Sequence, residues 1–185
     1  MARINVGEKM PNFVFNTGYR NDVKLYDELA ENKTVIWVLR YMGCTVCRYD
    51  IHEINKRYDE FKAKNSKVFV LMQSDQAHIQ EDFDRTNEHP ELEVIADPEM
   101  AIYKALDIKP AASMEELAGG PEGLAKLQAK GAKAAAAGFS HGDYEGDEQQ
   151  LPAMFILDKD GVVTYARYAA NIVDLPDVDG VLELL

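Results

Sequence analysis

An unbroken run of apolar and β-branched side chains at residues 34–39, reading Thr-Val-Ile-Trp-Val-Leu, limits the fold more than any other feature of the sequence. A strand of this kind predicts burial on both faces, as at the centre of a parallel or mixed sheet. The same character returns at residues 67–72 and, more weakly, at residues 92–96. Such strands need helices on both faces of the sheet, so an α/β fold is expected.

Helical patterns separate these strands. The longest begins near Cys44, where apolar residues recur at alternating spacings of four and three along one helical stripe. The stripe comprises Cys47, Ile51, Ile54, Tyr58 and Phe61. Shorter helices are predicted at residues 76–85 and 98–106, the second with Asp97 as its cap and Pro98 at its first position.

The last part of the chain predicts a β-hairpin and a terminal helix. Apolar runs at residues 153–157 and 162–168 flank an Asp-Lys-Asp-Gly turn, which is a hairpin signal. The terminal helix is expected at residues 178–185. The order of elements therefore alternates strand and helix three times before the hairpin, as in a sheet covered by helices.

Residues 111–150 interrupt this alternation and are interpreted as an insertion. They contain seven of the chain's 12 glycines around an alanine- and lysine-rich stretch. Gly131 costs a helix about 1 kcal/mol relative to alanine, so one or two short, mobile helices are expected within residues 124–137. The segment is expected either to cover the Cys44 end of the long helix with Leu124, Leu127 and Phe139, or to be a surface excursion that contacts nothing.

Length and charge narrow the function classes. The 185 residues, 46% of them hydrophobic, suit a single domain spanning residues 1–185. The net charge of -12 disfavours nucleic acid as a partner, because the overall field repels polyanions. The first residues show no apolar signal region, and no stretch reaches the roughly 18 apolar residues of a membrane span. A soluble, cytoplasmic protein without a membrane partner is expected.

The two cysteines, Cys44 and Cys47, carry the chemistry that the sequence suggests. Cys44 falls at the start of the long helix, where unpaired backbone N–H groups stabilise a thiolate, and an exposed position there would make it the attacking thiol. Cys47 lies one turn further, on the apolar stripe, where it would be shielded and act as the resolving thiol. Arg40 and Arg48 flank the pair and are candidates for electrostatic support of the thiolate.

Zinc binding and inert core cysteines are the alternatives to a redox pair. A structural zinc site needs four ligands, whereas the chain has no second cysteine pair and its four histidines are scattered. Neither a metal nor an organic cofactor is therefore expected. His52, beside Asp50 and Glu53, is interpreted as a solvated helix residue, and Trp37 as a core residue.

Four sequence segments together resemble the redoxin group of the thioredoxin superfamily, and most closely the AhpC/TSA-type, peroxiredoxin-like proteins that carry a Cys-x-x-Cys. The segments are residues 6–13 (VGEKMPNF), 38–48 (VLRYMGCTVCR), 95–98 (IADP) and 155–163 (FILDKDGVV). The resemblance implies a thioredoxin-like fold: a central mixed β-sheet flanked by helices, with the insertion of residues 111–150 before the final hairpin. It also implies antioxidant or thiol-disulfide oxidoreductase activity.

Two departures from the family bear on the activity. Typical peroxiredoxins show Pro-x-x-x-Thr-x-x-Cys, but counting back from Cys47 places Cys44 and Arg40 at the threonine and proline positions. Counting from Cys44 places Tyr41 and Trp37 there, so neither register fits.

The second departure lies three residues before Phe155, where peroxiredoxins commonly carry an arginine and this chain has Pro152. In thioredoxins a cis-proline at this place faces the cysteines and shapes a groove for extended peptides. The resemblance thus predicts a cis Pro152 and a substrate groove lined by Leu151, Pro152, Ala153, Tyr41 and Gly43. The alternative is a trans proline that opens a strand.

Three functions remain open at this point. The leading hypothesis is a thiol-disulfide oxidoreductase acting on a disulfide-containing protein or a small thiol or disulfide. The second is a peroxiredoxin-like thiol peroxidase that reduces hydrogen peroxide or organic hydroperoxides. Either enzyme would need an external thiol reductant. The third is a non-enzymatic redox-sensing module whose cysteine state orders or releases residues 111–150.

Overall fold

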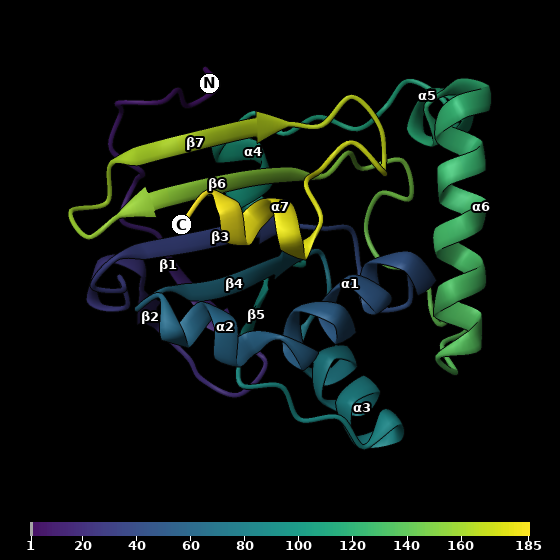
Figure 1. The fold of residues 1–185 in the computed structure, drawn as a ribbon, viewed down its shortest axis with the longest axis horizontal. Helices are drawn as coiled ribbons and strands as arrows, with labels where there is room; N and C mark the ends of the chain where they lie inside the picture. The colour runs from purple at the N-terminus through teal and green to yellow at the C-terminus, as the bar shows by residue number, and fades with distance from the viewer. Residues whose placement is uncertain (1) are drawn as a thin grey trace.

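A seven-stranded mixed sheet forms the centre of the computed structural model. The structure describes residues 2–185, so residue 1 of the expected domain 1–185 lies outside the described residues. The strand order is β2-β1-β5-β4-β3-β6-β7 (Figure 1). The strands are β1 (Val14–Thr17), β2 (Val23–Lys24), β3 (Lys33–Val38), β4 (Lys67–Met72), β5 (Glu93–Ala96), β6 (Ala153–Asp158) and β7 (Val163–Tyr168). The thioredoxin-like α/β fold expected from the sequence is thereby confirmed.

The helical elements lie between and beside these strands. They are η1 (Leu25–Asp27), α1 (Thr45–Lys56), α2 (Tyr58–Ala63), α3 (Gln76–Thr86), α4 (Ala101–Ala105), α5 (Met114–Ala118), α6 (Gly120–Ala136) and α7 (Val178–Glu183). In residues 2–185 none of these helices is long and apolar enough to cross a membrane.

β3 occupies the middle of the sheet, as its apolar sequence predicts. It pairs in parallel with β4 and antiparallel with β6, and residues 34–38 are all buried. The two N-terminal strands were not predicted from the sequence, because β1 has four residues, β2 has two, and neither carries an apolar run.

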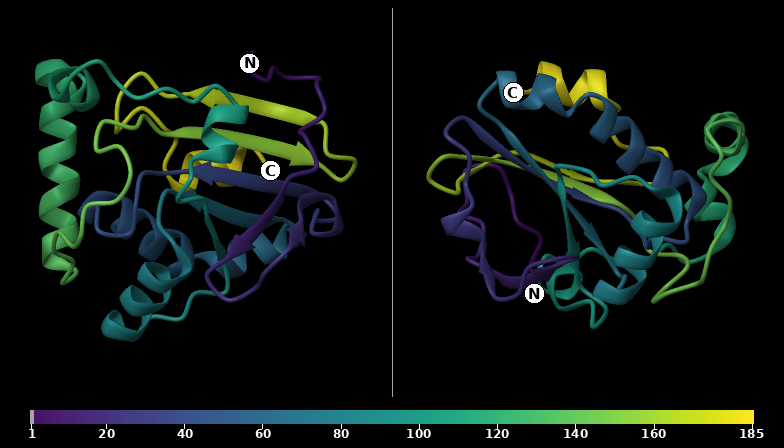
Figure 2. Two further views of the ribbon diagram at one scale, coloured as in Figure 1. Left: turned by 180° about the vertical axis from the view of Figure 1, so that it is seen from behind. Right: turned by 90° about the horizontal axis from the view of Figure 1, so that it is seen from below.

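Two separate cores cover the two faces of the sheet. Residues of α1, α2, α3 and α7 pack with one face, and α4 with the N-terminal segment packs with the other. Figure 2 shows α1, α2 and α7 together on one side of the sheet. All five residues of the predicted stripe are buried, although the chain breaks the helix at Arg57, between α1 and α2.

The predicted helix at residues 98–106 begins later than expected. α4 starts at Ala101, because Asp97 and the residues after it form a turn before the helix. The N-cap position is held by Met100, so the prediction of Asp97 as the N-cap and Pro98 as the first helical residue is wrong. The Asp97 side chain does accept hydrogen bonds from the first helical N–H groups, those of Ala101 and Ile102, both at 2.8 Å.

The insertion contains the short helix α5 and the long helix α6, and residues 124–136, where one or two short helices were expected, all belong to α6. α6 has 17 residues, includes Gly131, and stands at the side of the molecule next to α1 (Figures 1 and 2). Ala134 is fully buried and Leu127 packs against the core that contains the cysteines. These tertiary contacts and the high helix propensity of alanine outweigh the roughly 1 kcal/mol that Gly131 costs.

Candidate redox site

Cys44 and Cys47 lie in the first turn of α1 and are joined by a disulfide, with their Cα atoms 5.3 Å apart. Cys44 is the N-cap residue, in extended conformation, and directly follows the loop that leaves β3. Cys44 thus stands at the helix start, a position whose unpaired N–H groups favour a thiolate. The structure therefore brings the two predicted cysteines together at the predicted end of the central strand.

The expected exposure of Cys44 is wrong for this disulfide form, since Cys44 is only 2% exposed. Cys47 is shielded as expected, and it too is 2% exposed. The physical reason is that the insertion covers this end of α1. Cys44 nevertheless lines a cavity of about 160 Å³, whereas Cys47 is not among the residues that line it. Apolar side chains from α1, α5 and α6, including Val46, Leu117 and Leu127, form much of its wall.

Arg40 supplies a positive charge at the Cys44 sulfur. Its Nη1 donates to Sγ of Cys44 at 3.6 Å, and its Nη2 donates to the hydroxyl of Tyr41 at 3.4 Å and to the carbonyl of Glu148. Burial lowers the pKa of the Arg40 guanidinium, which nonetheless stays charged because an arginine in a protein does not lose its proton near neutral pH. Once the disulfide is reduced, this charge favours the Cys44 thiolate.

Tyr41 and His141 continue the hydrogen-bonded chain from Arg40. The Tyr41 hydroxyl lies 3.3 Å from Nε2 of His141, and Nδ1 of His141 lies 2.7 Å from the carbonyl of Gly142. A carbonyl only accepts, so Nδ1 carries the proton and Nε2 of a neutral imidazole accepts from Tyr41. Burial raises the pKa of Tyr41, which keeps its hydroxyl protonated as a donor.

His141 is the site residue that sequence reasoning missed. It was counted among scattered histidines, yet it lines the same cavity as Cys44. Tyr41 and His141 are 100 positions apart, and no spacing rule connects two such positions. Only the return of the insertion to the cysteine loop brings them together.

Residues 140–148, termed the return segment, lie directly on the cysteine loop. The Gly142 N–H donates to the Gly43 carbonyl at 2.9 Å, and a Cβ atom on Gly43 would overlap the Asp143 carbonyl oxygen. Gln73 exchanges two hydrogen bonds with the backbone of Asp147, at 3.2 and 2.6 Å. Gly43, predicted to line a substrate groove, thus contacts the return segment.

The predicted cover is confirmed at one of its three named residues. Leu127 lines the Cys44 cavity, whereas Leu124 is 44% exposed. Phe139 packs against α1 on a different side, with its ring centroid 6.5 Å from that of Tyr49 and 5.2 Å from that of His52. The insertion is therefore no free excursion, because it closes over the first turn of α1.

Arg48 does not direct its charge to the cysteines. Its guanidinium is 98% buried from solvent and forms ion pairs with Asp82 and, at 2.9 Å, with Glu88. Glu88 also lies 3.1 Å from Nδ1 of His52, so His52 has a carboxylate partner rather than only solvent. Of the two arginines proposed for electrostatic support, only Arg40 contacts a cysteine.

The prediction of a cis Pro152 is wrong, since the Leu151–Pro152 peptide bond is trans. Pro152 precedes the first residue of β6, where the missing N–H costs nothing, and its carbonyl accepts from the Ala169 N–H at 3.1 Å. Leu151 packs against the core that contains both cysteines, whereas Ala153 belongs to the core on the opposite face of the sheet. The expected groove residues thus lie on both sides of the sheet.

Asp75, His78 and Glu145 are the three described side chains whose potential metal-binding atoms approach one another, all within 4.8 Å. They already satisfy one another, because Nδ1 of His78 lies 3.0 Å from Asp75 and 3.4 Å from Glu145. The cluster joins the start of α3 to the return segment. The hydrogen bond that the His78 ring donates to Asp75 raises the pKa of His78, and burial raises the pKa of Glu145.

Comparison with known proteins agrees with this architecture. The model of the AhpC/TSA family matches residues 6–166, whereas no curated protein matches the sequence. Peroxiredoxin 6 of Arenicola marina is 14% identical, with a TM-score of 0.70 over 98% of this chain and 71% of that chain. A yeast mitochondrial 1-Cys peroxiredoxin is 15% identical, with a TM-score of 0.69 over 98% and 74%.

A third structure, the reduced 2-Cys peroxiredoxin of Plasmodium vivax, is 16% identical, with a TM-score of 0.65 over 97% of this chain and 79% of that chain. At these identities the three likenesses concern the fold. They show that the sheet, its flanking helices and the order of elements correspond along nearly the whole chain.

Proposed function

The chain belongs to the AhpC/TSA family, and from that premise we propose that it is a thiol peroxidase in which Cys44 attacks a hydroperoxide and Cys47 resolves the product. The sequence alone favoured thiol-disulfide exchange as the leading hypothesis and placed the peroxidase second. The present proposal ranks the peroxidase first. The trans bond at Pro152 removes the argument for a peptide groove. The peroxiredoxin fold of the structural neighbours adds weight to the peroxidase.

The cavity at Cys44 is the observation that carries the proposal. Its volume of about 160 Å³ is well below the roughly 300 Å³ at which pockets for drug-sized ligands begin. It therefore suits a small hydroperoxide better than an extended peptide. Arg40 enters it beside the sulfur, where its charge supports both the thiolate and the oxygen atoms of a peroxide.

The proposed reaction uses both cysteines. The Cys44 thiolate attacks the distal oxygen of the hydroperoxide, the O–O bond breaks, and the leaving alkoxide takes up a proton, which gives a sulfenic acid and an alcohol. The Cys47 thiolate then attacks the Cys44 sulfur, the S–O bond breaks, and the hydroxide leaves as water after protonation. The product is the Cys44–Cys47 disulfide seen here.

Two equivalents of an external thiol return the pair to the reduced state, and the thiols are themselves oxidised to a disulfide. The structural work on the yeast mitochondrial relative names the glutathione and thioredoxin systems. We propose a reductant of that kind, a small or protein thiol, for this chain.

Disulfide exchange on another molecule stays a second candidate, because a Cys-x-x-Cys joined at a helix start is the arrangement that such reactions use. A redox-sensing module stays a third. It is supported by the hydrogen bond between Gly43 and Gly142, through which the cysteine loop contacts the return segment.

Trapping the sulfenic acid tests the peroxidase proposal. In a Cys47→Ser variant, hydrogen peroxide should yield a dimedone adduct on Cys44, because the resolving attack is removed. Mass spectrometry of the digested protein locates the adduct. An adduct on Cys47 in Cys44→Ser, with none on Cys44 in Cys47→Ser, would reverse the two roles. Absence of an adduct in both variants would overturn the peroxidase.

A further inference from the structure

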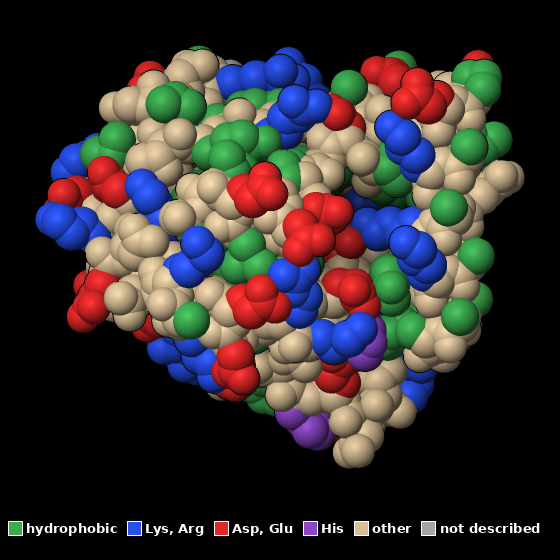
Figure 3. Space-filling model, viewed as in Figure 1, with side chains coloured by type: hydrophobic (Ala, Val, Ile, Leu, Met, Phe, Trp, Pro, Cys, Tyr) green, Lys and Arg blue, Asp and Glu red, His purple; other side chains and the backbone are tan. Residues whose placement is uncertain are grey.

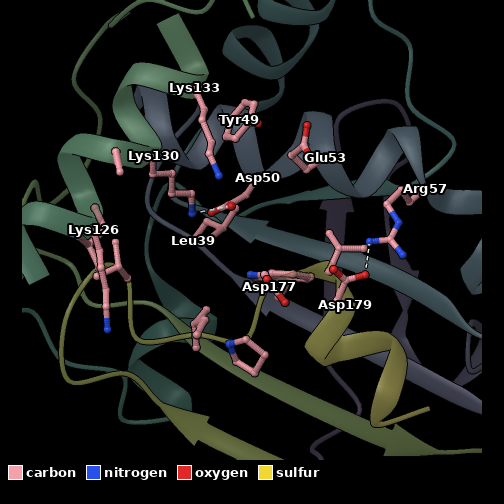
Figure 4. Close-up of a pocket in the computed structure, with 17 residues that line it drawn as sticks. Leu39, Tyr49, Asp50, Glu53, Arg57, Lys126, Lys130, Lys133, Asp177 and Asp179 are labelled. Carbon is pink, nitrogen blue, oxygen red and sulfur yellow. Dashed lines mark hydrogen bonds and ion pairs between the residues drawn. The ribbon is translucent and has the colours of Figure 1, made fainter. Parts of the chain in front are cut away.

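A second and larger cavity, of about 490 Å³, lies between α1, α6 and the segment that leads into α7. Figure 4 shows its lining residues, and Figure 3 shows the hollow between α6 and the rest of the molecule. Ile172 lines both this cavity and the one at Cys44, but neither cysteine lines the larger one. Its volume lies in the range of small-molecule sites, about 300–1,000 Å³.

The α6 wall of the cavity carries three lysines. Lys126, Lys130 and Lys133 follow one another at spacings of four and three, which places them on one face of the helix. Figure 4 shows the side chains of Lys130 and Lys133 extending from α6 toward Asp50 on α1. The rest of the lining adds Arg57 and four acidic residues, so the excess of positive charge is confined to the α6 wall. The four are Asp50, Glu53, Asp177 and Asp179.

Lys133 is the only one of these three lysines without an ion-pair partner among residues 2–185. Lys130 pairs with Asp50 at 2.6 Å and Lys126 pairs with Glu122 at 2.9 Å. The acidic residues that line the cavity are already engaged. Asp50 binds Lys130, Glu53 binds Lys56, Asp179 binds Arg57, and Asp177 accepts from the Gly180 N–H. Asp177 therefore keeps a negative charge without a cation partner among the described residues, on the α7 side of the cavity. On the α6 wall Lys133 is the described cation without a charged partner, and a carboxylate bound there would supply one.

Trp37 supplies an independent sign of a missing ligand. It lines the cavity from β3 and is 2% exposed, and its indole N–H has no hydrogen-bond partner among the described residues. A buried donor without a partner loses its hydrogen bond to water and gains none in exchange, so such groups are rare in folded proteins. An acceptor atom on a bound molecule would satisfy it.

The remaining surface of the cavity is largely apolar. Leu39, Ile172, Leu175 and Pro176 line it between the charged wall of α6 and Trp37. An apolar body, a carboxylate and a carbonyl acceptor are thus the three features that would match the lining. We propose that this cavity binds a small organic carboxylate of that description, of the N-acylated amino-acid type, with its carboxylate at Lys133. The inference does not depend on the peroxidase proposal.

The single tryptophan of the chain makes the site directly observable. Titration of the ¹⁵N-labelled, full-length protein with N-acetyl-phenylalanine should shift the one indole N–H resonance in a saturable way. The neutral methyl ester of the same probe should bind about tenfold more weakly or worse, because it lacks the charge that Lys133 selects.

Matched lysine variants complete the test. Lys133→Gln should weaken binding of N-acetyl-phenylalanine by about tenfold or more, whereas Lys109→Gln, an exposed lysine that does not line the cavity, should bind as the original chain does. An unchanged backbone spectrum shows that each variant is folded. An indole resonance that does not move, or equal affinities for Lys133→Gln and Lys109→Gln, would overturn the proposal.

Discussion

Arg40 lies four residues before Cys44, and Arg48 lies one residue after Cys47. The two arginines nevertheless make different contacts. Arg40 donates to the Cys44 sulfur, whereas Arg48 is held by Asp82 and Glu88. Sequence adjacency to the cysteines therefore says little about which charge acts on them. Direction of the side chain decides it, and two predictions at the residue scale separate the two arginines.

Replacing Arg40 by Met should raise the pKa of the reduced Cys44 thiol, because the cation that favours the thiolate is lost. A rise of one pKa unit corresponds to about a tenfold smaller thiolate fraction below the pKa, and we expect at least that loss in the reaction with peroxide at neutral pH. Alkylation rates measured against pH report the pKa. Arg167→Met, at an arginine paired with Asp174 instead, is the control. Equal pKa values in both variants would refute the role of Arg40.

Replacing Arg48 by Met should lower the free energy of unfolding by about 3–5 kcal/mol, because Asp82 and Glu88 lose their buried partner. The Cys44 pKa should not change. Arg85→Met is the matched control, since Arg85 pairs with the same Asp82 from a side chain that is 60% exposed, and its loss should cost about 1 kcal/mol or less. Denaturant unfolding measures both values, and similar losses would contradict the account.

At the scale of elements, the insertion forms much of the wall around Cys44. α6 and the return segment close over the first turn of α1, and Leu127 forms part of the cavity wall. The local sequence of the insertion predicted helix and turns but not this docking. A hydrophobic residue on an alanine-rich helix does not specify which surface it packs against. The prediction that the insertion covers Cys44 therefore rested only on the position of the insertion in the chain.

Leu127→Ala should enlarge the cavity and raise the rate with a bulky hydroperoxide, such as cumene hydroperoxide, relative to the rate with hydrogen peroxide. The removed side chain leaves space that the buried surroundings refill only partly. Leu124→Ala, at an exposed position of the same helix, is the control and should leave the ratio of rates unchanged. A ratio that responds equally to both changes would mean that Leu127 does not restrict entry.

The return segment should be held less firmly at alkaline pH. His78 faces Asp75, Asp143 and Glu145, and its pKa lies above the ordinary value of 6.5, chiefly through the hydrogen bond to Asp75. A raised pKa means that the folded state favours the protonated form. The stabilisation is therefore fully present below about pH 6.5 and is lost as pH rises through the raised pKa.

Hydrogen exchange of the return segment, corrected for the chemical rate, measures this effect. The opening free energy of residues 140–148 should fall between about pH 6 and about pH 9. His78→Asn should remove that pH dependence, since asparagine keeps a hydrogen-bonding side chain and cannot be charged. An identical pH dependence in the variant would show that another group controls the segment.

For the whole molecule, the sequence predicted what local patterns determine. Three features appear where expected: the apolar strand at residues 34–39, the stripe from Cys47 to Phe61, and the Asp-Gly hairpin. Each depends on residues that are close together in the sequence, so a local pattern predicts it. The approach of His141 to Tyr41 depends on a contact across 100 positions, which no local pattern encodes. The isomer of Pro152 rested on resemblance alone, and the structure has the other isomer.

The same division applies to the function. The Cys-x-x-Cys and its place at a helix start predicted redox chemistry, and the chain does belong to the AhpC/TSA family with its two cysteines joined. In the proposed function, the preference for a peroxide over a disulfide comes from the small space beside Cys44, which is bounded by residues of α5, α6 and the return segment. It is a property of the assembled fold rather than of any motif.

The central claim is that the reduced protein reacts with peroxides in preference to disulfides. The most direct test compares two second-order rate constants for the reduced protein, one with hydrogen peroxide and one with a protein disulfide such as insulin. The account predicts a peroxide rate at least about a hundredfold above that of free cysteine at the same pH, a transition-state gain of about 2.7 kcal/mol, and only slow reduction of the disulfide. A peroxide rate no greater than that of free cysteine, together with rapid reduction of insulin, would contradict it.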